Sequence, residues 1–244
     1  MSSNVKIYKY HKPYKWVLTI TVLIILILGC VFLYSKEDEV KDVFAHNNNH
    51  VQNIENSDWN LILVNEWNKI PEDYTLDLMN LSNGNMVDKR IYPELQQMFD
   101  DARSQGIYPT ISSSYRNSSE QQKMMDDKIE AFINEGHSRK EAEKLAKSWV
   151  AEPGTSEHEL GLALDINADK TKSDNDTVYS WLEKNSYKYG FIVRYPSEKA
   201  KITGVSHEPW HFRYVGKKAA KEIYEKGLCL EEYIKELKDK ANES

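Results

Sequence analysis

Cysteine is scarce in this chain of 244 residues, and its scarcity excludes two kinds of structure. The only two cysteines are Cys30 and Cys229. This number cannot build a disulfide framework, and it cannot supply a cysteine-rich zinc site. Cys229 stands between two leucines, where we expect it to act as a small buried hydrophobic residue.

An excess of positive charge is also lacking. The chain has 32 lysines and arginines against 38 aspartates and glutamates, which gives a formal net charge of -6. Proteins that bind nucleic acid show a basic patch or stripe that neutralises phosphates. Nucleic acid is therefore not an expected partner. Internal repeats are absent as well, which favours one compact domain over a repeat architecture.

What the N-terminus does contain is a long apolar run. Residues 16–34 carry no charge and are long enough to cross a bilayer as a helix. Four lysines and no acids precede the run, which predicts a cytoplasmic N-terminus. An Ala-x-Ala-like cleavage site is missing, so a removed signal peptide is disfavoured. Cleavage and lipidation at Cys30 is the alternative, although the bulky Leu28 fits it poorly.

These features divide the chain into four parts. Residues 36–57 are charged and rich in amide side chains, a composition typical of a flexible stalk. We predict a cytoplasmic tail at 1–15, a transmembrane anchor at 16–34, a stalk at 35–57 and a catalytic domain at 58–240 that lies outside the cell. The oligomeric state cannot be read from the sequence.

The hydrophobic periodicity of the domain predicts an alternation of helices and strands. We expect strands at 61–64, 107–113, 162–166 and 191–195. We expect helices at 93–106, from 118 to 136 with Ser118 and Gln121 as a capping box, from Ser138 and Glu141 to 149, at 177–189 and at 217–226. Helices followed by mostly strands predict an α+β fold with an antiparallel sheet.

Two segments in the second half supply the chemistry of a zinc hydrolase. One reads Ser156-Glu-His-Glu-Leu-Gly-Leu-Ala-Leu-Asp165, and the other reads Glu208-Pro-Trp-His211. A catalytic zinc site needs three protein ligands, an open position for water and a separate carboxylate as the base. His158, Asp165 and His211 are the predicted ligands, and Glu208 is the predicted base.

A competing interpretation pairs His207 with His211 as zinc ligands. Residues 207–211 match H-E-x-x-H, a motif that binds zinc only when both histidines lie on one face of a helix. Pro209 stands inside this motif, where it would break a helix. The flanking residues are β-branched and aromatic, which favours a strand for His211. His207 is then expected near the site or at the surface.

The spacing within the first segment also has a physical reason. His158 and Asp165 are too far apart for one helical turn, so a loop that leads into a strand must bring them together. Gly161 allows the turn. Alternation along the strand sends Ala163 and Asp165 to the same face, and the small Ala163 leaves space for a substrate.

The motifs resemble those of zinc peptidoglycan peptidases, a group that includes lysostaphin-like enzymes and the hedgehog signalling domain. Ser-x-His-x-x-Gly-x-Ala-x-Asp and Glu-x-Trp-His are most similar to the VanY-type D,D-carboxypeptidases of glycopeptide resistance. The resemblance runs from about Trp59 to Tyr233 and includes Ser113-Ser-Tyr-Arg116. It implies a central antiparallel sheet that cradles the metal, with helices flanking it.

The resemblance also implies further roles. Arg116 is expected to stabilise the oxyanion, for which the fork of a guanidinium is suited. Gln121 and Ser156 match positions that contact substrate, although Gln121 could instead cap a helix. The implied activity is zinc-dependent removal of the C-terminal D-alanine from peptidoglycan stem peptides that end in D-Ala-D-Ala.

Three alternatives remain open from the sequence. L,D-carboxypeptidases and D,D-dipeptidases share this site and differ in pocket shape, although the helical insertion at 120–150 favours the D,D-carboxypeptidase. The third alternative belongs to another class, a non-catalytic zinc-containing module that binds the cell wall. Retention of Glu208 and Arg116 argues against that class, because a structural zinc site needs no base.

Overall fold

The computed structural model describes residues 59–243. The predicted cytoplasmic tail, transmembrane anchor and stalk lie outside these residues. Within the described range, none of the helices has the length and apolar character needed to cross a membrane.

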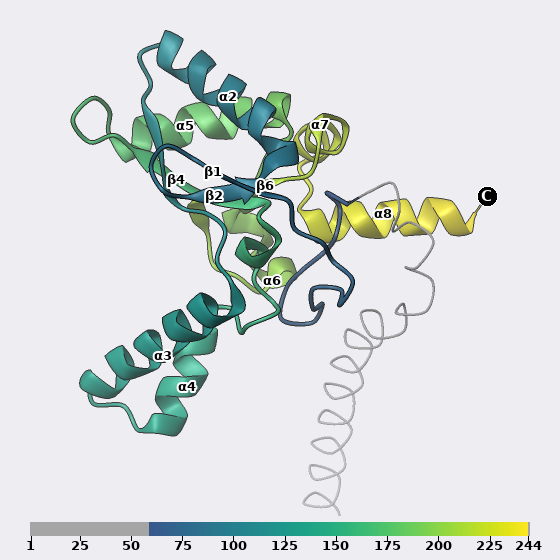
Figure 1. Cartoon of the computed structure of the whole chain (residues 1–244). Helices are drawn as coiled ribbons and strands as arrows, with labels where there is room; N and C mark the ends of the chain where they lie inside the picture. The colour runs from purple at the N-terminus through teal and green to yellow at the C-terminus, as the bar shows by residue number, and fades with distance from the viewer. Residues whose placement is uncertain (1–58, 244) are drawn as a thin grey trace, which may run out of the picture. The chain divides into compact units, whose positions relative to one another are not determined.

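The centre of the domain is a four-stranded sheet in the order β3-β4-β6-β5. Its strands are β3 (Pro109–Ser113), β4 (Ala163–Ala168), β6 (Glu208–Tyr214) and β5 (Phe191–Tyr195). All three pairings are antiparallel. The predicted α+β fold with an antiparallel sheet is therefore confirmed. A separate two-stranded hairpin, β1 (Leu78–Asn80) and β2 (Met86–Asp88), was not predicted (Figure 1).

Helices flank this sheet. The α-helices are α2 (Tyr92–Ser104), α3 (Ser118–Asn134), α4 (Arg139–Lys147), α5 (Asn175–Asn185), α6 (Ala200–Thr203), α7 (Lys217–Lys226) and α8 (Leu230–Asn242). Short 3-10 helices are η2 (Lys89–Ile91), η3 (Glu157–Leu160), η4 (Ser186–Tyr189) and η5 (Ser197–Lys199). The sequence predicted α2, α3, α4, α5 and α7, but it did not predict α6 or α8.

One face of the sheet carries the main apolar core. Leu164 and Ile166 of β4 and Phe212 of β6 are fully buried there, against α2 and α5. The helix α2 contributes the predicted face, and all of its members are buried: Leu95, Met98, Phe99 and Ala102. Because side chains alternate along a strand, the residues between these apolar positions point to the other face. That face carries Asp165 and His211.

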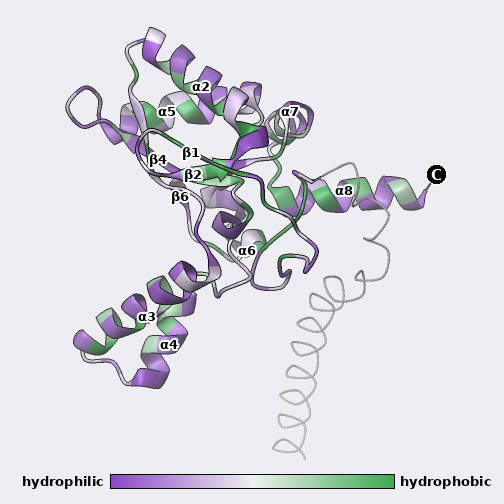
Figure 2. Cartoon of the chain, in the orientation of Figure 1, coloured by the Kyte–Doolittle hydropathy of each residue, from purple (hydrophilic) through white to green (hydrophobic). Residues whose placement is uncertain are grey.

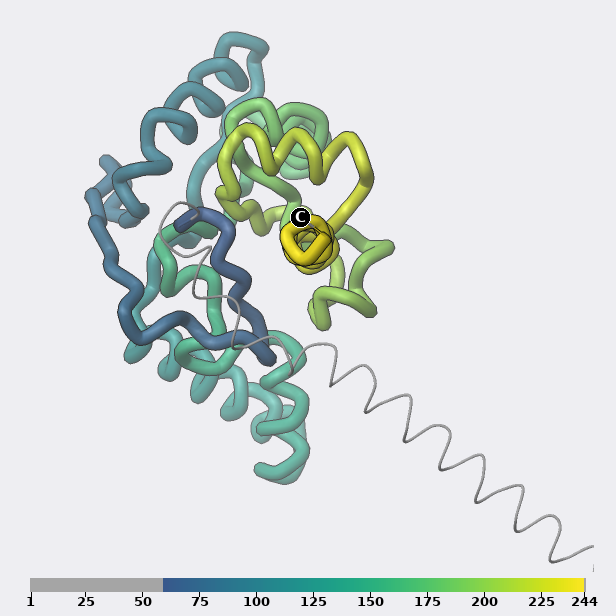
Figure 3. Tube along the Cα trace, turned by 90° about the vertical axis from the view of Figure 1, so that its right-hand side faces the viewer, coloured from purple at the N-terminus to yellow at the C-terminus, as the bar shows by residue number. Residues whose placement is uncertain are grey.

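A second apolar cluster lies at the C-terminal end of the domain. Ala220 and Ile223 of α7 pack with Leu230 and Tyr233 of α8 against Ile192 of β5. Hydrophobic and hydrophilic bands alternate along α8, as expected of an amphipathic helix (Figure 2). Figure 3 looks along α8 from the C-terminus and shows α7 beside it. Cys229 is 2% exposed at the start of α8, as a small buried residue should be.

The helices α3 and α4 form a hairpin that extends away from the sheet (Figure 1). The capping box of α4, Ser138 with Glu141, is confirmed. The predicted box of α3 is wrong by one residue, because Asn117 and Glu120 exchange the two capping hydrogen bonds and Ser118 is the first helical residue. Asparagine is as good an N-cap as serine, so composition alone could not decide.

The predicted strand at 61–64 is also wrong. This segment has no strand partner among the described residues. Arg213 Nη2 instead donates to the carbonyl oxygen of Ile62 at 2.8 Å and to that of Asn60, just before the segment, at 3.2 Å. The buried guanidinium of Arg213 thus supplies hydrogen-bond donors that a neighbouring strand would otherwise supply.

Candidate metal centre

The register of the sheet brings two predicted ligands together. Asp165 of β4 and His211 of β6 are directly paired across the two strands. His158 reaches the same place from η3, which ends at Gly161 in the left-handed conformation with φ at 68°. A β-carbon at Gly161 would lie 3.0 Å from the backbone nitrogen of Asp88, so glycine is required there for both torsion and space. His207 is not part of this group.

The donor atoms of these three residues are spaced for a metal ion. One atom from each of His158, Asp165 and His211 lies within 4.8 Å of the other two. Asp165 Oδ1 is 3.5 Å from His158 Nε2 and 3.3 Å from His211 Nδ1. Neighbouring corners of a tetrahedron with bonds of about 2.05 Å are about 3.3 Å apart, which suits zinc. Asp165 Oδ1 is also buried without a hydrogen-bond partner, as expected of a ligand atom.

In each imidazole, the nitrogen that does not face Asp165 lies beside another oxygen atom. His158 Nδ1 lies 2.7 Å from the carbonyl oxygen of Ser114. A carbonyl can only accept, so Nδ1 carries the proton and Nε2 keeps a free lone pair for a metal. His211 Nε2 lies 3.5 Å from Glu157 Oε2, and its Nδ1 faces Asp165. Both rings therefore direct one nitrogen, His158 Nε2 and His211 Nδ1, toward Asp165.

Charges alter the proton affinities of these groups. Burial opposes a charge on His211, but contacts with Asp165 and Glu157 outweigh it and raise the pKa of this histidine to about 9. Burial likewise opposes ionisation of Asp165, yet the two imidazoles hold the pKa of its carboxyl well below the ordinary value. An ionised carboxylate between two imidazoles is an environment that attracts a cation.

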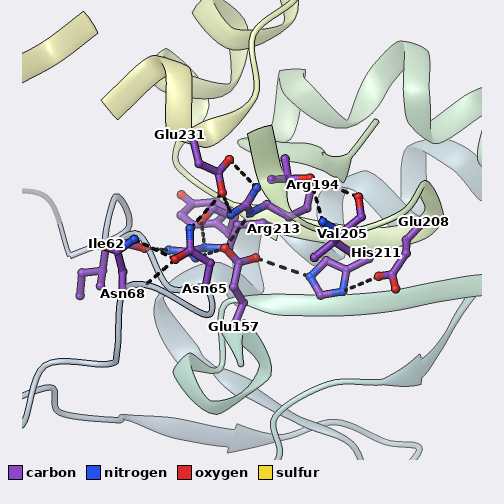
Figure 4. A network of polar contacts seen from close by, with 12 residues as sticks. Ile62, Asn65, Asn68, Glu157, Arg194, Val205, Glu208, His211, Arg213 and Glu231 are labelled. Carbon is purple, nitrogen blue, oxygen red and sulfur yellow. Dashed lines mark hydrogen bonds and ion pairs between the residues drawn. The ribbon is translucent and has the colours of Figure 1, made fainter. Parts of the chain in front are cut away.

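A buried network of charges behind His211 was not predicted. Glu157 Oε1 accepts from Arg194 Nε and from Arg213 Nη1, both at 2.8 Å (Figure 4). Arg194 also binds both oxygens of Glu231 on α8, at 2.9 and 2.6 Å. All four side chains are at most 2% exposed. Burial opposes ionisation of Glu157, but the two guanidiniums hold the pKa of its carboxyl well below the ordinary value.

Glu208 lies at the first position of β6, beside the proposed ligands. Its Oε2 is 3.7 Å from His211 Nδ1, and it pairs across the strands with Tyr195. Burial raises the pKa of Glu208 above the ordinary value for a glutamate. A carboxylate that binds protons more readily, close to the metal ligands and not one of them, suits a general base.

A cleft with a volume of about 380 Å³ lies beside the three proposed ligands, and Arg116 is one of the residues that line it. Arg116 forms no ion pair within residues 59–243, and its Nε is buried without a hydrogen-bond partner. Burial lowers the pKa of Arg116, while Asp165, Glu159 and Glu208 act to raise it. A guanidinium without an anionic partner, in a cleft beside a metal site, suits a substrate carboxylate or an oxyanion.

Gln121 and Ser156 also line this cleft. Gln121 Nε2 donates to the carbonyl of Ala151 at 2.7 Å, which ties α3 to the segment after α4. Its Oε1 is buried and has no hydrogen-bond partner, so it remains free to accept from a ligand. Ser156 is 5% exposed and directly precedes η3.

His207 lies on the opposite side of β6 from the cleft. Its Nδ1 is 3.0 Å from the carbonyl oxygen of Tyr195. It borders a second hollow of about 590 Å³, which α5, β5 and α7 line and which contains none of the three proposed ligands. The strand conformation of residues 208–214 confirms that H-E-x-x-H does not form a helical zinc site here.

Comparison with known proteins agrees with this geometry. A family model described as VanY, D-alanyl-D-alanine carboxypeptidase, matches residues 84–217. A D-alanyl-D-alanine carboxypeptidase of Enterococcus faecalis is 54% identical over 177 residues, which cover 72% of this chain and 66% of that protein.

Two solved structures share the fold. One is a mutant of the vancomycin resistance D,D-pentapeptidase VanY from a VanB-type resistance cassette, in complex with Zn(II). It has 55% identity and a TM-score of 0.70, over 72% of this chain and 99% of that chain. The other is VanYB in complex with D-alanine-D-alanine, with 54% identity and a TM-score of 0.71, over 72% of this chain and 98% of that chain.

Proposed function

Because this chain belongs to the VanY family of D-alanyl-D-alanine carboxypeptidases, we propose that it removes the C-terminal D-alanine from peptidoglycan pentapeptide stems. The reaction is zinc-dependent hydrolysis of a peptide bond. The observation that carries the proposal is the convergence of one donor atom each from His158, Asp165 and His211, with Glu208 and Arg116 at the same cleft.

The residues of the chain take distinct roles in this reaction. His158 Nε2, Asp165 Oδ1 and His211 Nδ1 would hold the ion. When bound, zinc would supply Lewis acidity and would lower the pKa of a water molecule, which could then lose a proton near neutral pH and attack a carbonyl. Glu208 accepts a proton from the attacking water and returns it to the departing D-alanine nitrogen. Arg116 donates to the oxygen that becomes negative as the carbonyl is attacked. Ser156 and Gln121 position the peptide.

Two variants separate binding of the metal from the chemistry. Glu208→Gln keeps the ligands and removes the base, so we expect zinc binding near the wild-type level and loss of nearly all turnover. His158→Ala removes a ligand, so we expect loss of zinc as well as activity. Release of D-alanine from a synthetic pentapeptide and the zinc content of the purified protein are measured together. Glu222→Gln on α7 is the control for the charge change.

Near-normal rates in the Glu208→Gln variant would refute the assignment of the base. Activity that survives complete removal of zinc by a chelator would rule out the metal-dependent mechanism. If zinc-loaded protein releases no D-alanine from any stem peptide, the domain is a binding module.

Substrate choice is tested by comparing three peptides that share the reactive site. We expect the pentapeptide that ends in D-Ala-D-Ala to be hydrolysed faster than the tetrapeptide and the free dipeptide. A relative that is 55% identical is described as a D,D-pentapeptidase, which supports this order. Faster release from the tetrapeptide would identify an L,D-carboxypeptidase, and faster cleavage of the dipeptide would identify a dipeptidase.

We also propose that residues 16–34 anchor the enzyme in the cell membrane with its catalytic domain outside. The apolar run and the lysines before it support this orientation. From there the enzyme would trim D-alanine from stem peptides and lower the number of glycopeptide targets. The full chain should fractionate with membranes and be degraded by added protease in intact protoplasts. Protection from protease would contradict the orientation.

A further inference from the structure

Glu157 stands directly behind His211, on the side away from the proposed metal position. Its two oxygens have different surroundings. Oε1 accepts from Arg194 and Arg213, whereas Oε2 accepts from neither and faces His211 Nε2 at 3.5 Å (Figure 4). Oε2 and Nε2 are both buried, and neither has a hydrogen-bond partner nearer than this contact. Buried polar atoms are normally satisfied, so these two serve each other.

We propose that Glu157 is a positioning residue that fixes the proton of His211 on Nε2 and thereby keeps Nδ1 bare for zinc. This inference rests on the proposed zinc site. A neutral imidazole has one protonated and one bare nitrogen, and a neighbouring acceptor selects which is which. Ser114 does this for His158 through its carbonyl oxygen. Glu157 does it for His211.

The network around Glu157 also determines which way its carboxylate turns. The two guanidiniums bind Oε1 from β5 and β6, and Arg194 is held in turn by Glu231 of α8. The carboxylate therefore cannot rotate to give both oxygens to the arginines. Oε2 is directed at the imidazole, and the two glutamates balance the charge of the two arginines.

The substitution Glu157→Gln tests this geometry because it preserves shape and reverses one hydrogen-bonding role. The amide oxygen of the glutamine takes the place of Oε1, where two donors require an acceptor. Its NH2 group then faces His211 Nε2 as a donor. That arrangement favours a bare Nε2 and a proton on Nδ1, and a protonated Nδ1 cannot bind a metal.

Glu231→Gln is the matched control. It removes one buried carboxylate charge from the same network, but Glu231 binds Arg194 and does not contact His211. Zinc dissociation constants are measured by competition with a chelator, and the free energy of unfolding of each metal-free variant is measured with denaturant. We expect both variants to lose stability, which separates loss of stability from loss of metal binding.

The expected result is a zinc affinity roughly 10- to 100-fold weaker in Glu157→Gln, the usual effect of losing the partner of a metal-binding histidine. Glu231→Gln should bind zinc within about 3-fold of wild type, well below that usual effect. Saturating zinc should restore much of the turnover of Glu157→Gln, in contrast to Glu208→Gln. Unchanged zinc affinity in Glu157→Gln, or an equal loss in Glu231→Gln, overturns the inference. A wild-type chain that binds no zinc overturns the proposed function itself.

Discussion

At the scale of single residues, the site depends on fixed directions as much as on residue types. Asp165 and His211 face each other because their strands are paired in one register, and a shift of one residue would turn both side chains away. His158 is oriented by one carbonyl oxygen. The donor atoms are therefore in place before a metal arrives, which lowers the cost of binding it.

Arg116 provides a test of charge stabilisation that leaves the metal ligands intact. Arg116→Lys keeps a positive charge but loses the planar fork of donors. We expect zinc binding to be unchanged and kcat to fall by roughly 100- to 1000-fold, the usual cost of losing an oxyanion donor. Arg139→Lys, on the exposed side of α4, is the control. A change in kcat of less than about 3-fold for Arg116→Lys would be far below that usual cost and would exclude this role.

Tyr74 links the segment before β1 to the metal-binding loop, because its hydroxyl donates to the carbonyl of Leu160 at 2.7 Å. Burial, and next the charge of Asp88, raise the pKa of Tyr74 to about 12. The contribution of the Tyr74 hydroxyl to the free energy of unfolding is thus complete below its ordinary pKa of 10.0. It is lost as the pH rises through about 12.

Tyr74→Phe should lower the free energy of unfolding by about 1 kcal/mol at pH 8, the typical value of one hydrogen bond. Between pH 10 and about 12 the difference between wild type and variant should shrink, because phenylalanine cannot ionise. Urea unfolding at several pH values measures this, with the exposed Tyr224→Phe as control. A difference that stays constant up to pH 12 would contradict the coupling.

The predicted site residues were found from short motifs, and the structure brings all of them to one cleft. Glu157 was missed although it lies between Ser156 and His158. Its partners Arg194 and Arg213 are 37 and 56 positions away in the sequence, and Glu231 is a further 37 positions beyond Arg194. Each looks like an ordinary surface charge when read alone. Only the fold shows that they are buried together.

At the scale of elements, local sequence signals predicted the bounds of several helices and strands. The predicted bounds of β5 and α7 are confirmed to the residue. The segment 61–64 has the composition of a strand, but the carbonyl of Ile62 binds Arg213, a contact that no local pattern reveals. The helix α8 was not predicted, although its apolar residues Leu230, Tyr233, Ile234 and Leu237 have the spacing of one helical face.

Gly161 follows the last residue of η3, and its conformation fixes the position of the loop that carries His158. A side chain there meets the backbone of Asp88 at 3.0 Å, in addition to the strain of φ at 68°. Gly106 has a similar φ of 79° with open space around it. We expect both alanine variants to lose about 1–2 kcal/mol of stability from the left-handed backbone.

Only Gly161→Ala should also weaken zinc binding, because the displaced loop carries His158. The zinc dissociation constants of the two alanine variants are compared with that of wild type. Equal zinc affinity in both would mean that the contact with Asp88 does not position the ligand loop.

At the scale of the whole molecule, the metal site connects parts of the chain that are separate in sequence. The three ligands come from η3, β4 and β6, and the charge network behind them reaches α8. A ligand that binds only the folded state stabilises it by mass action. Zinc should therefore act as a cross-link for the domain as well as a catalyst.

We expect zinc to raise the midpoint of thermal unfolding, with about 4 kcal/mol of stabilisation at a free zinc concentration 1,000 times the dissociation constant. A chelator should reverse the shift. His158→Ala is the control and should show little response. An equal zinc response in wild type and His158→Ala would place the ion elsewhere.

The hairpin of α3 and α4 extends from the sheet, yet the segment that follows it forms one wall of the cleft. Gln121 and Ala151 close this hairpin on itself. Its length and side chains can therefore diverge in evolution while the register of β4 and β6 stays unchanged. The three proposed ligands lie on η3, β4 and β6 and not on this hairpin, so we expect its exchange to alter substrate preference and to leave zinc affinity unchanged.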